Sequence, residues 1–381
     1  MRSQNLRNRL VRLAARGPLP ARVSPLGGRP RRVLLVRPDH IGDVLLTSPA
    51  IALLRASLPT AELTYLVGPW SKEAAAQGVA VDRIATLAFP GFTRRRKANV
   101  LEPYALLLHE ALRLRQARFD LAVIFRRDHW WGALLALTAG VPVRVGGLTP
   151  ETAPLLTHAH AGRPGEHAVD EALGVARLAL ESVGVALDKM PGEVVFRVGD
   201  AARAEAARWW AQQGLERQRV VAIQPSAGAA LKSWPIERWR ALAARLDESV
   251  LWTGGPGDEA LLRPIAAGAP VACGQRLELT AALFERCALV IAPDSGAAHL
   301  ASAVGTPSLR LYGPAPVAKF GPWPQTARDQ HVVLADALEC MPCGYLERPP
   351  CGARTEPACM LALSVDQVLA TAKGMLAQIE N

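Results

Sequence analysis

The feature that most limits the fold of this chain is a series of short aliphatic runs, each followed by a segment with helical apolar spacing. Unbroken aliphatic runs of this kind are typical of strands that a parallel sheet buries on both faces. In the first part of the chain we predict strands at 32–37, 63–67, 121–125 and 142–146, with helices at 44–58 and 103–117. This alternation predicts a parallel sheet with helices on both faces.

The pattern breaks at Met190-Pro191-Gly192 and then starts again. A helix predicted at 200–213 leads to predicted strands at 220–224, 250–253, 288–292 and 308–312, with helices at 236–246 and 258–267. Because 381 residues exceed the size at which one core keeps growing, two domains are expected. We therefore predict an α/β chain with two doubly wound, Rossmann-like domains: a basic extension at 1–31, domains at 32–192 and 193–363, and a C-terminal helix at 364–381. This last helix starts with the capping pair Ser364 and Gln367 and can pack on the first domain.

Positive charge is concentrated at the start of the chain. The net charge is +10, and ten arginines but no lysine precede the first acidic residue, Asp39. If residues 2–16 form a helix, leucines and arginines occupy different faces, which suits an anionic membrane surface. A disordered basic tail explains the same composition equally well.

Several classes of protein fit the sequence poorly. The N-terminal stretch lacks the apolar core and cleavage site of a signal peptide, and no apolar run approaches the roughly 18 residues of a spanning helix. The basic residues are not interleaved with aromatic residues that could stack on bases, so nucleic acid is not an expected partner. Membrane contact is therefore expected to be peripheral.

The loop after the first predicted strand carries groups suited to chemistry, namely Asp39, His40, Gly42 and Asp43. Ligands of open α/β sheets bind beyond the carboxyl ends of the strands, where this loop is expected. Gly42 lets a substrate approach the backbone closely. Asp43 is either a catalytic carboxylate or the N-cap of the following helix.

Two further groups of cations lie in the first domain. Four consecutive cations occupy a loop, and Arg126 follows the third predicted strand; the four are Arg94, Arg95, Arg96 and Lys97. A run of charges is often only a solvated surface, but a phosphorylated acceptor needs such a patch.

In the second domain, the loop after the strand at 220–224 runs from Ser226 to Lys232. Its small residues leave room for phosphate oxygens, and Lys232 can supply positive charge to a leaving diphosphate, although an ordinary solvated lysine is the alternative. Leu231 stands where a Walker A loop requires glycine, which disfavours a P-loop NTPase.

The loop at 253–259 follows the next strand and carries Asp258 and Glu259. It lacks the order of glycines that a dinucleotide site requires. One interpretation is a nucleoside pocket in which either acid contacts ribose or base; the other is a glycine turn capped by Asp258.

The segment Pro293 to Leu300 follows an aliphatic strand and opens an apolar helix. Its backbone N–H groups, carboxylate and hydroxyl are placed where a helix N-terminus can hold an anion. We therefore predict a phosphate-binding loop formed by Asp294, Ser295, Gly296, Ala297 and His299.

Four cysteines cluster near the C-terminus, at Cys340, Cys343, Cys351 and Cys359. Four thiolates within 20 residues suit a structural zinc or an iron–sulfur cluster, with reduced thiols or local disulfides as the alternatives.

Taken together, these motifs resemble those of glycosyltransferase family 9, typified by the lipopolysaccharide heptosyltransferases. The resemblance spans about residues 33–376. It is carried by Ile41-Gly42-Asp43-Val44, by Lys232-Ser233-Trp234-Pro235, and by Asp294-Ser295-Gly296 with His299-Leu300-Ala301 and Gly305-Thr306-Pro307.

The resemblance implies a GT-B fold, in which two Rossmann-like domains face each other across a cleft. It also implies an ADP-sugar donor, typically ADP-heptose, and inversion at the anomeric carbon without a catalytic metal. Asp43 stands at the family's general base, and Lys232 would hold the diphosphate together with the loop at 294–297. The family's acidic nucleoside contact maps onto either Asp258 or Glu259.

The leading hypothesis is an inverting glycosyltransferase, cytoplasmic and peripheral on the inner face of a bacterial cytoplasmic membrane. It would move a heptose or related sugar to a phosphorylated, lipid-linked or lipopolysaccharide-core acceptor, contacted by His40, Gly42, Arg126 and the cations at 94–97. Two rivals stay open: a non-catalytic nucleotide-sugar or glycolipid binding protein, and a sugar-nucleotide epimerase of GT-B form.

Overall fold

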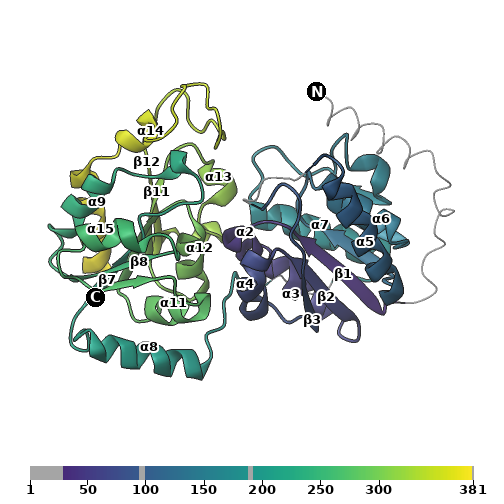
Figure 1. Ribbon diagram of the computed structural model, residues 1–381, viewed down its shortest axis with the longest axis horizontal. Coiled ribbons are helices and arrows are strands. Elements are labelled where there is room, and N and C mark those ends of the chain that lie inside the picture. Colours follow the sequence, from purple (N-terminus) through teal and green to yellow (C-terminus); the bar gives the residue numbers. More distant parts are fainter. Residues whose placement is uncertain (1–28, 94–98, 188–191, 380–381) are drawn as a thin grey trace. The chain divides into compact units, whose positions relative to one another are not determined.

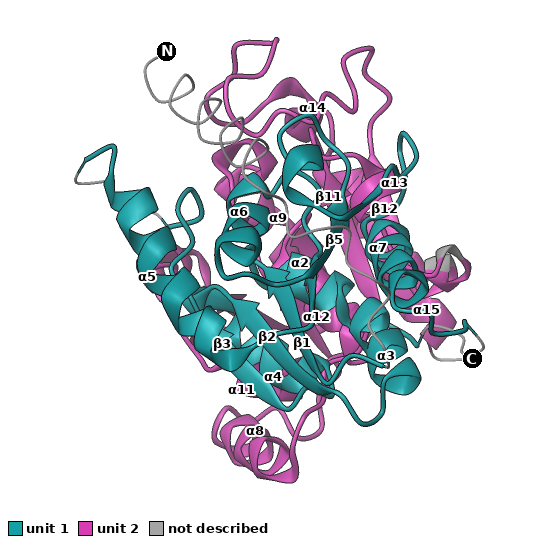
Figure 2. Ribbon diagram, turned by 90° about the vertical axis from the view of Figure 1, so that its right-hand side faces the viewer, with its two compact units in different colours: residues 1–193 teal, residues 194–381 magenta. Residues whose placement is uncertain are grey.

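The structure is a computed structural model that describes residues 29–93, 99–187 and 192–379. The chain divides into two compact units, residues 1–193 and 194–381 (Figures 1 and 2). The predicted amphipathic segment at 2–16 and the four cations at 94–97 lie outside the described residues.

The first unit contains a six-stranded parallel sheet in the order β3-β2-β1-β4-β5-β6. Its strands are β1 (Arg32–Arg37), β2 (Glu62–Val67), β3 (Arg83–Thr86), β4 (Leu121–Ile124), β5 (Val143–Gly147) and β6 (His158–His160). Its helices are α2 (Ile41–Leu46), α3 (Ser48–Ser57), α4 (Lys72–Gly78), α5 (Glu102–Ala117), α6 (Trp130–Thr138) and α7 (Ala168–Ser182), with the 3₁₀ turns η1 (Pro69–Ser71) and η2 (Ala153–Leu155).

The second unit repeats this architecture with the order β12-β11-β10-β7-β8-β9, again all parallel. Its strands are β7 (Val220–Ile223), β8 (Ser249–Gly254), β9 (Val271–Cys273), β10 (Leu289–Pro293), β11 (Ser308–Tyr312) and β12 (His331–Ala335). Its longer helices are α8 (Asp200–Gln212), α9 (Ile236–Ala243), α11 (Leu277–Phe284), α12 (Gly296–Ala303) and α15 (Val365–Ile379). The short ones are α10 (Glu259–Leu262), α13 (Val317–Phe320), α14 (Ala358–Leu361), η3 (Ala230–Lys232), η4 (Arg263–Ile265) and η5 (Gln325–Asp329).

The two sheets share one topology, and this confirms the predicted α/β class. In each sheet the first strand along the chain pairs with the second and the fourth, so the strand order reverses beside it. Ligands of doubly wound sheets bind beyond the carboxyl ends of the strands at this switch point. The positions to inspect are therefore the ends of β1 and β4 in the first unit and of β7 and β10 in the second.

The predicted helix at 44–58 is in fact two helices, α2 and α3, which meet at Thr47. Pro49 lies in the first turn of α3, where its missing N–H costs nothing, but it cannot continue the hydrogen-bond ladder of α2. The short α2 consequently ends one turn after Asp43.

The C-terminal helix α15 belongs to the second unit. The predicted capping pair is confirmed: the Ser364 N–H donates to Gln367 Oε1 at 2.9 Å, and the Gln367 N–H donates to Ser364 Oγ at 3.2 Å. The apolar face of α15 packs on α9 and completes the core of the second sheet. Its Val368 and Leu376 share that core with Trp239 and Ile223, because the face of the sheet beside α9 would otherwise expose aliphatic side chains.

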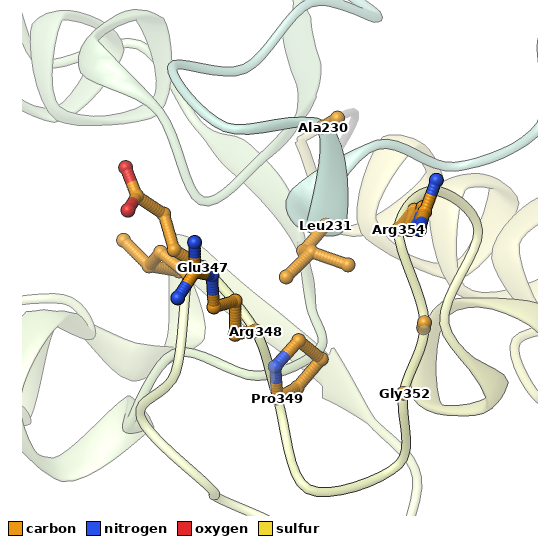
Figure 3. A pocket seen from close by; sticks show the side chains of 9 residues that line it. Ala230, Leu231, Glu347, Arg348, Pro349, Gly352 and Arg354 are labelled. Carbon is orange, nitrogen blue, oxygen red and sulfur yellow. The ribbon is translucent and has the colours of Figure 1, made fainter.

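The loop between β12 and α14, which carries Cys340, Cys343 and Cys351, turns back beside η3. Leu231 of η3 and residues 346–354 of this loop enclose a pocket of about 450 Å³ (Figure 3). Arg348 and Arg354 line it together with Pro349.

Candidate active site

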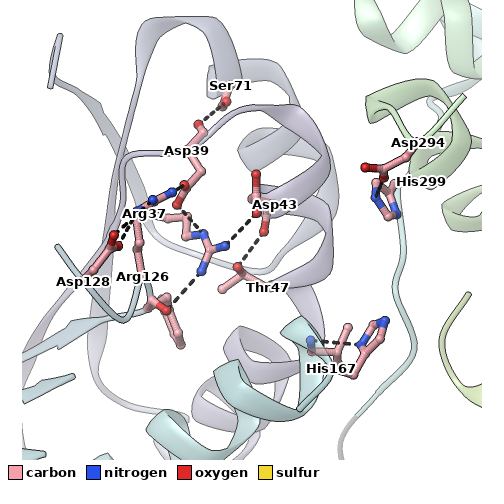
Figure 4. A network of polar contacts seen from close by, with 12 residues as sticks. Arg37, Asp39, Asp43, Thr47, Ser71, Arg126, Asp128, His167, Asp294 and His299 are labelled. Atoms are coloured by element: carbon pink, nitrogen blue, oxygen red, sulfur yellow. Dashed lines mark hydrogen bonds and ion pairs between the residues drawn. The ribbon is translucent and has the colours of Figure 1, made fainter. Parts of the chain in front are cut away.

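In the first unit, charged side chains gather at the switch point. Asp39 follows β1, Asp43 lies in the first turn of α2, and Arg126 follows β4, the neighbour of β1. The N-cap of α2 is His40, so the structure rules out the interpretation of Asp43 as the cap. The Asp43 side chain points instead toward Arg37, the last residue of β1 (Figure 4).

Arg37 joins the two carboxylates of this cluster. Its Nη2 donates to Asp43 Oδ1 at 3.1 Å, and its Nε lies 2.8 Å from Asp39 Oδ2. Its Nη1 donates to the carbonyl of Phe125 at 3.0 Å. Arg126 pairs with the other oxygen of Asp39 and contacts Asp128, with 2.7 Å between its Nε and Asp128 Oδ1. The result is a line of alternating charges (Figure 4).

The two carboxylates differ in exposure and in the direction in which their pKa values are shifted. The Asp39 side chain is only 3% exposed, yet Arg37 and Arg126 outweigh the effect of burial and hold its pKa below the usual value. The Asp43 side chain is 32% exposed, and burial together with the nearby Asp39 charge raises its pKa against the opposing effect of Arg37. Environments that push two such pKa values apart are typical of sites where one carboxylate accepts a proton and the other stays charged.

Other predicted acceptor contacts surround this cluster. The His40 ring lies 5.4 Å from the ring of Trp70, and Gly42 is inside α2. Trp70 Nε1 and Ser71 Oγ each donate to the carbonyl of Asp39 at 2.9 Å. Motif reading missed Arg37, Trp70 and Ser71, because their role depends on strand pairing and on a turn distant in sequence.

In the second unit, polar groups gather at the ends of β7 and β10, which are paired neighbours. Lys232 Nζ lies 2.6 Å from Asp294 Oδ2, directly after β10. The hydroxyl oxygens of Ser226 and Ser295 are buried and have no hydrogen-bond partner among the described residues. Buried hydroxyls normally have a hydrogen-bond partner. Two without one near the carboxyl ends of neighbouring strands therefore indicate a place for a polar ligand.

The predicted anion loop forms the start of α12. Ser295 is the N-cap but does not cap the helix with its side chain, and Gly296 and Ala297 are the first helical residues. The N–H groups of this first turn have no carbonyl partner within the helix and favour an anion. His299 is 7% exposed, and its Nε2 lies 3.8 Å from Asp294 Oδ1 (Figure 4).

The two predicted nucleoside contacts are both engaged locally. Asp258 Oδ2 accepts a 2.7 Å hydrogen bond from the N–H of Gly255, which is the turn-capping interpretation. Glu259 Oε1 accepts a 2.7 Å hydrogen bond from Arg263 Nε on the helix surface. A role in binding a nucleoside stays a prediction for both.

Metal binding at the four clustered cysteines stays a prediction. All four line one small cavity, but within the described part of the chain no three His, Cys, Asp or Glu side chains are arranged to hold a metal. The loop turns Cys340 and Cys351 toward solvent, whereas Cys359 is buried at the start of α14. The four thiols therefore border the same cavity but differ in their exposure to solvent.

Comparison with known proteins identifies relatives that match parts of both units. The family model for glycosyltransferase family 9 (heptosyltransferase) matches residues 108–348. Lipopolysaccharide heptosyltransferase 3 of Escherichia coli is 27% identical over 298 residues, which cover 74% of this chain and 83% of the relative.

Two solved structures share the fold. The glycosyl transferase family 9 protein of Veillonella parvula superposes with a TM-score of 0.71 at 22% identity, covering 91% of this chain and 97% of that one. The E. coli ADP-heptose lipopolysaccharide heptosyltransferase II gives a TM-score of 0.70 at 18% identity, covering 92% and 100% of the two chains.

Proposed function

Because this chain belongs to glycosyltransferase family 9 and has that family's GT-B fold, we propose that it transfers a heptose from an ADP-sugar to a lipopolysaccharide-core or related lipid-linked acceptor. A relative of the same fold is named for ADP-heptose, and a curated relative is a lipopolysaccharide heptosyltransferase. The observation that carries the proposal is the pair of unsatisfied buried hydroxyls beside Lys232, at the switch point of the second sheet.

The first unit supplies the base in this proposal. Asp43 accepts the proton of an acceptor hydroxyl while the acceptor oxygen attacks the anomeric carbon of the donor sugar. The new carbon–oxygen bond forms opposite the breaking bond to phosphate, so the configuration inverts and ADP leaves with the electron pair. A carboxylate that is one-third exposed and has a raised pKa is suited to this proton transfer.

The second unit holds the leaving group. Negative charge develops on the diphosphate as the bond to sugar breaks, and Lys232 with the first turn of α12 stabilises that charge. The hydroxyls of Ser226 and Ser295 donate hydrogen bonds to phosphate oxygens. His299 lies against Asp294 and helps to hold its carboxylate in place. Asp258 or Glu259 contacts the nucleoside. Every step is assigned to a side chain or backbone group, so the proposed mechanism uses no catalytic metal.

The acceptor and the membrane belong to the first unit in this proposal. His40, Gly42, Arg126 and the cations at 94–97 contact a phosphorylated glycan. No described helix is long and apolar enough to cross a bilayer. Two features support a peripheral position on the anionic inner face of the cytoplasmic membrane: the basic segment at 1–31 and the exposed leucines of α5.

Paired variants test the function and separate its two halves. Replacing the base, Asp43→Asn, should lower transfer from ADP-heptose by roughly 10²–10⁴-fold while leaving ADP binding intact. The Lys232→Met variant should lose the increase in melting temperature that ADP gives the wild type, and ADP should stabilise the wild type more than UDP or GDP does. Asp200→Asn, at a fully exposed carboxylate, and Lys373→Met, at a surface ion pair, are the matched controls.

Three results would contradict the proposal in different ways. If Asp43→Asn turns over like the wild type, Asp43 is not the base. Tight ADP-sugar binding with no transfer to any core acceptor indicates a binding protein. Scrambling of the donor sugar without acceptor indicates an epimerase.

A further inference from the structure

Arg37 is a buried cation with three separate tasks. Its side chain is 9% exposed, and each of its three guanidinium nitrogens faces a different acceptor: Asp39, the Phe125 carbonyl and Asp43. A charge so deeply buried is costly unless it is paired and hydrogen-bonded. The geometry therefore fixes the guanidinium plane between β1, β4 and α2.

This arrangement orients Asp43 in one direction. The 3.1 Å bond from Arg37 engages Oδ1, and Thr47 Oγ1 donates to the Asp43 carbonyl at 2.7 Å, which ties the first turn of α2 to its end. A lysine could not make these three contacts, because a single ammonium group on a flexible chain does not present donors in the fixed plane of a guanidinium.

We propose that Arg37 is the positioning residue of the transfer reaction, holding Oδ1 of Asp43 so that Oδ2 faces the acceptor hydroxyl. The inference rests on the proposed role of Asp43 as the base. Asp39 holds Arg37 in place and is itself held by Arg126.

Asp39 and Arg37 have opposite effects on the pKa of Asp43. Burial and the Asp39 charge raise the pKa of Asp43, whereas Arg37 and Arg126 lower it. Tyr65 of β2 is buried beside this cluster. The other helices packed on α2 carry further charged or titratable groups, which the test leaves unchanged: Arg55 on α3, Lys72 and Glu73 on α4, and His167, Asp170 and Glu171 at the start of α7.

The test is the dependence of kcat/KM on pH. Because the base acts as a carboxylate, activity falls as pH drops through its pKa. In Arg37→Gln that fall should begin at a higher pH. The ratio of the variant's kcat/KM to that of the wild type should therefore be smaller at pH 6 than at pH 9, by about tenfold or more. In Asp39→Asn the fall should begin at a lower pH than in wild type. A folding defect cannot shift the two profiles in opposite directions.

Conservative variants control for burial. The pH profile of Arg37→Lys should lie closer to the wild-type profile than that of Arg37→Gln does, because the positive charge is kept. Its rate should still be lower than that of the wild type, because the planar geometry of the guanidinium is lost. Arg144→Lys changes another buried arginine of the same unit, one that donates to the carbonyls of Val141, Pro142 and Leu155, and its pH profile should match wild type.

The outcomes separate this inference from the proposed function. If Asp43→Asn is inactive but neither Arg37→Lys nor Arg37→Gln moves the profile, the positioning role is wrong and the base assignment stands. If Asp43→Asn retains wild-type turnover, both are wrong. Should Arg37→Gln fail to fold, the directions measured for Arg37→Lys and Asp39→Asn decide, and a shift of both to the same side overturns the inference.

Discussion

At the scale of single residues, burial and neighbouring charges together set the direction in which each pKa shifts. Asp39 and Asp43 are four positions apart and share Arg37, yet their pKa values move in opposite directions because only Asp39 lies between two arginines. His129, also in this region, is 4% exposed, and its ring nitrogens have no hydrogen-bond partner among the described residues. Its ring packs edge-on against Phe89 and Phe92, with centroids 5.2 and 5.8 Å away.

His129 should make the stability of the protein depend on pH. Burial lowers its pKa to about 4, so the unfolded chain binds a proton that the native state does not between about pH 6.5 and about pH 4. Stability is therefore lost as pH falls through this window, by up to about 3 kcal/mol from this residue.

Urea unfolding at pH 7 and pH 4.5 checks this expectation. His129→Phe should reduce the difference between the two pH values, while His331, whose pKa is also lowered to about 4, still contributes in the second unit. His109→Phe, at an exposed site, is the control. An unchanged difference in His129→Phe means that the ring is protonated or accessible in the native state.

At the scale of elements, the interior strands were predictable and the edge strands were not. The strands β1, β2, β4 and β5 have aliphatic runs because helices cover both faces of the sheet. All four strands that the sequence analysis missed, β3, β6, β9 and β12, are sheet edges. They are short or only half-buried, so their residues do not form the unbroken apolar run that marks a central strand.

Helix α5 has an exposed apolar stripe that the proposed membrane position explains. Leu101, just before the helix, and Leu108 and Leu112 within it are 66%, 58% and 64% exposed and fall on one face at helical spacing. Arg115 and Arg118 are exposed near its C-terminal end. Leucines beside cations suit the interface of an anionic bilayer.

Vesicle binding tests this assignment of α5. The triple variant Leu101→Gln, Leu108→Gln and Leu112→Gln should bind vesicles of phosphatidylglycerol and phosphatidylethanolamine several-fold more weakly than wild type in a sedimentation assay. The matched triple at exposed leucines elsewhere is Leu187→Gln, Leu261→Gln and Leu346→Gln. Equal vesicle binding by the two triple variants contradicts a role for α5 in membrane binding. If the α5 variant binds vesicles like the wild type but no longer forms a dimer that the wild type forms, the leucines contact a second protein chain instead.

At the scale of the whole molecule, each unit closes its own core with segments far apart in the chain. In the second unit the core joins Val221 of β7 to Leu376 of α15, more than 150 positions later. Trp234 and Trp239 belong to the same core and pack edge-on, with ring centroids 5.0 Å apart, and Trp234 Nε1 donates to the Leu363 carbonyl at 2.9 Å. The last helix is thus part of the donor-binding unit in our proposal.

Truncating α15 side chains should therefore destabilise this unit. Leu376→Ala, at a position 2% exposed, should lower the free energy of unfolding by about 2–5 kcal/mol, because a cavity replaces the side chain. Leu361→Ala, at a leucine 40% exposed, should cost much less. Equal effects in urea unfolding would contradict the packing of α15 on this core.

Local chemistry in the sequence was enough to determine the α/β class, the interior strands, the capping pair of α15 and the places of Asp43, Lys232 and Asp294 shortly after the strands β1, β7 and β10. These features depend on periodicity and on residues adjacent in the chain. Only the tertiary structure showed that Arg37 bridges Asp39 and Asp43, that the hydroxyls of Ser226 and Ser295 are buried without partners among the described residues, and that the four spaced cysteines border one cavity. Each of these depends on strand pairing or loop path, which brings together atoms that sequence spacing alone leaves unrelated.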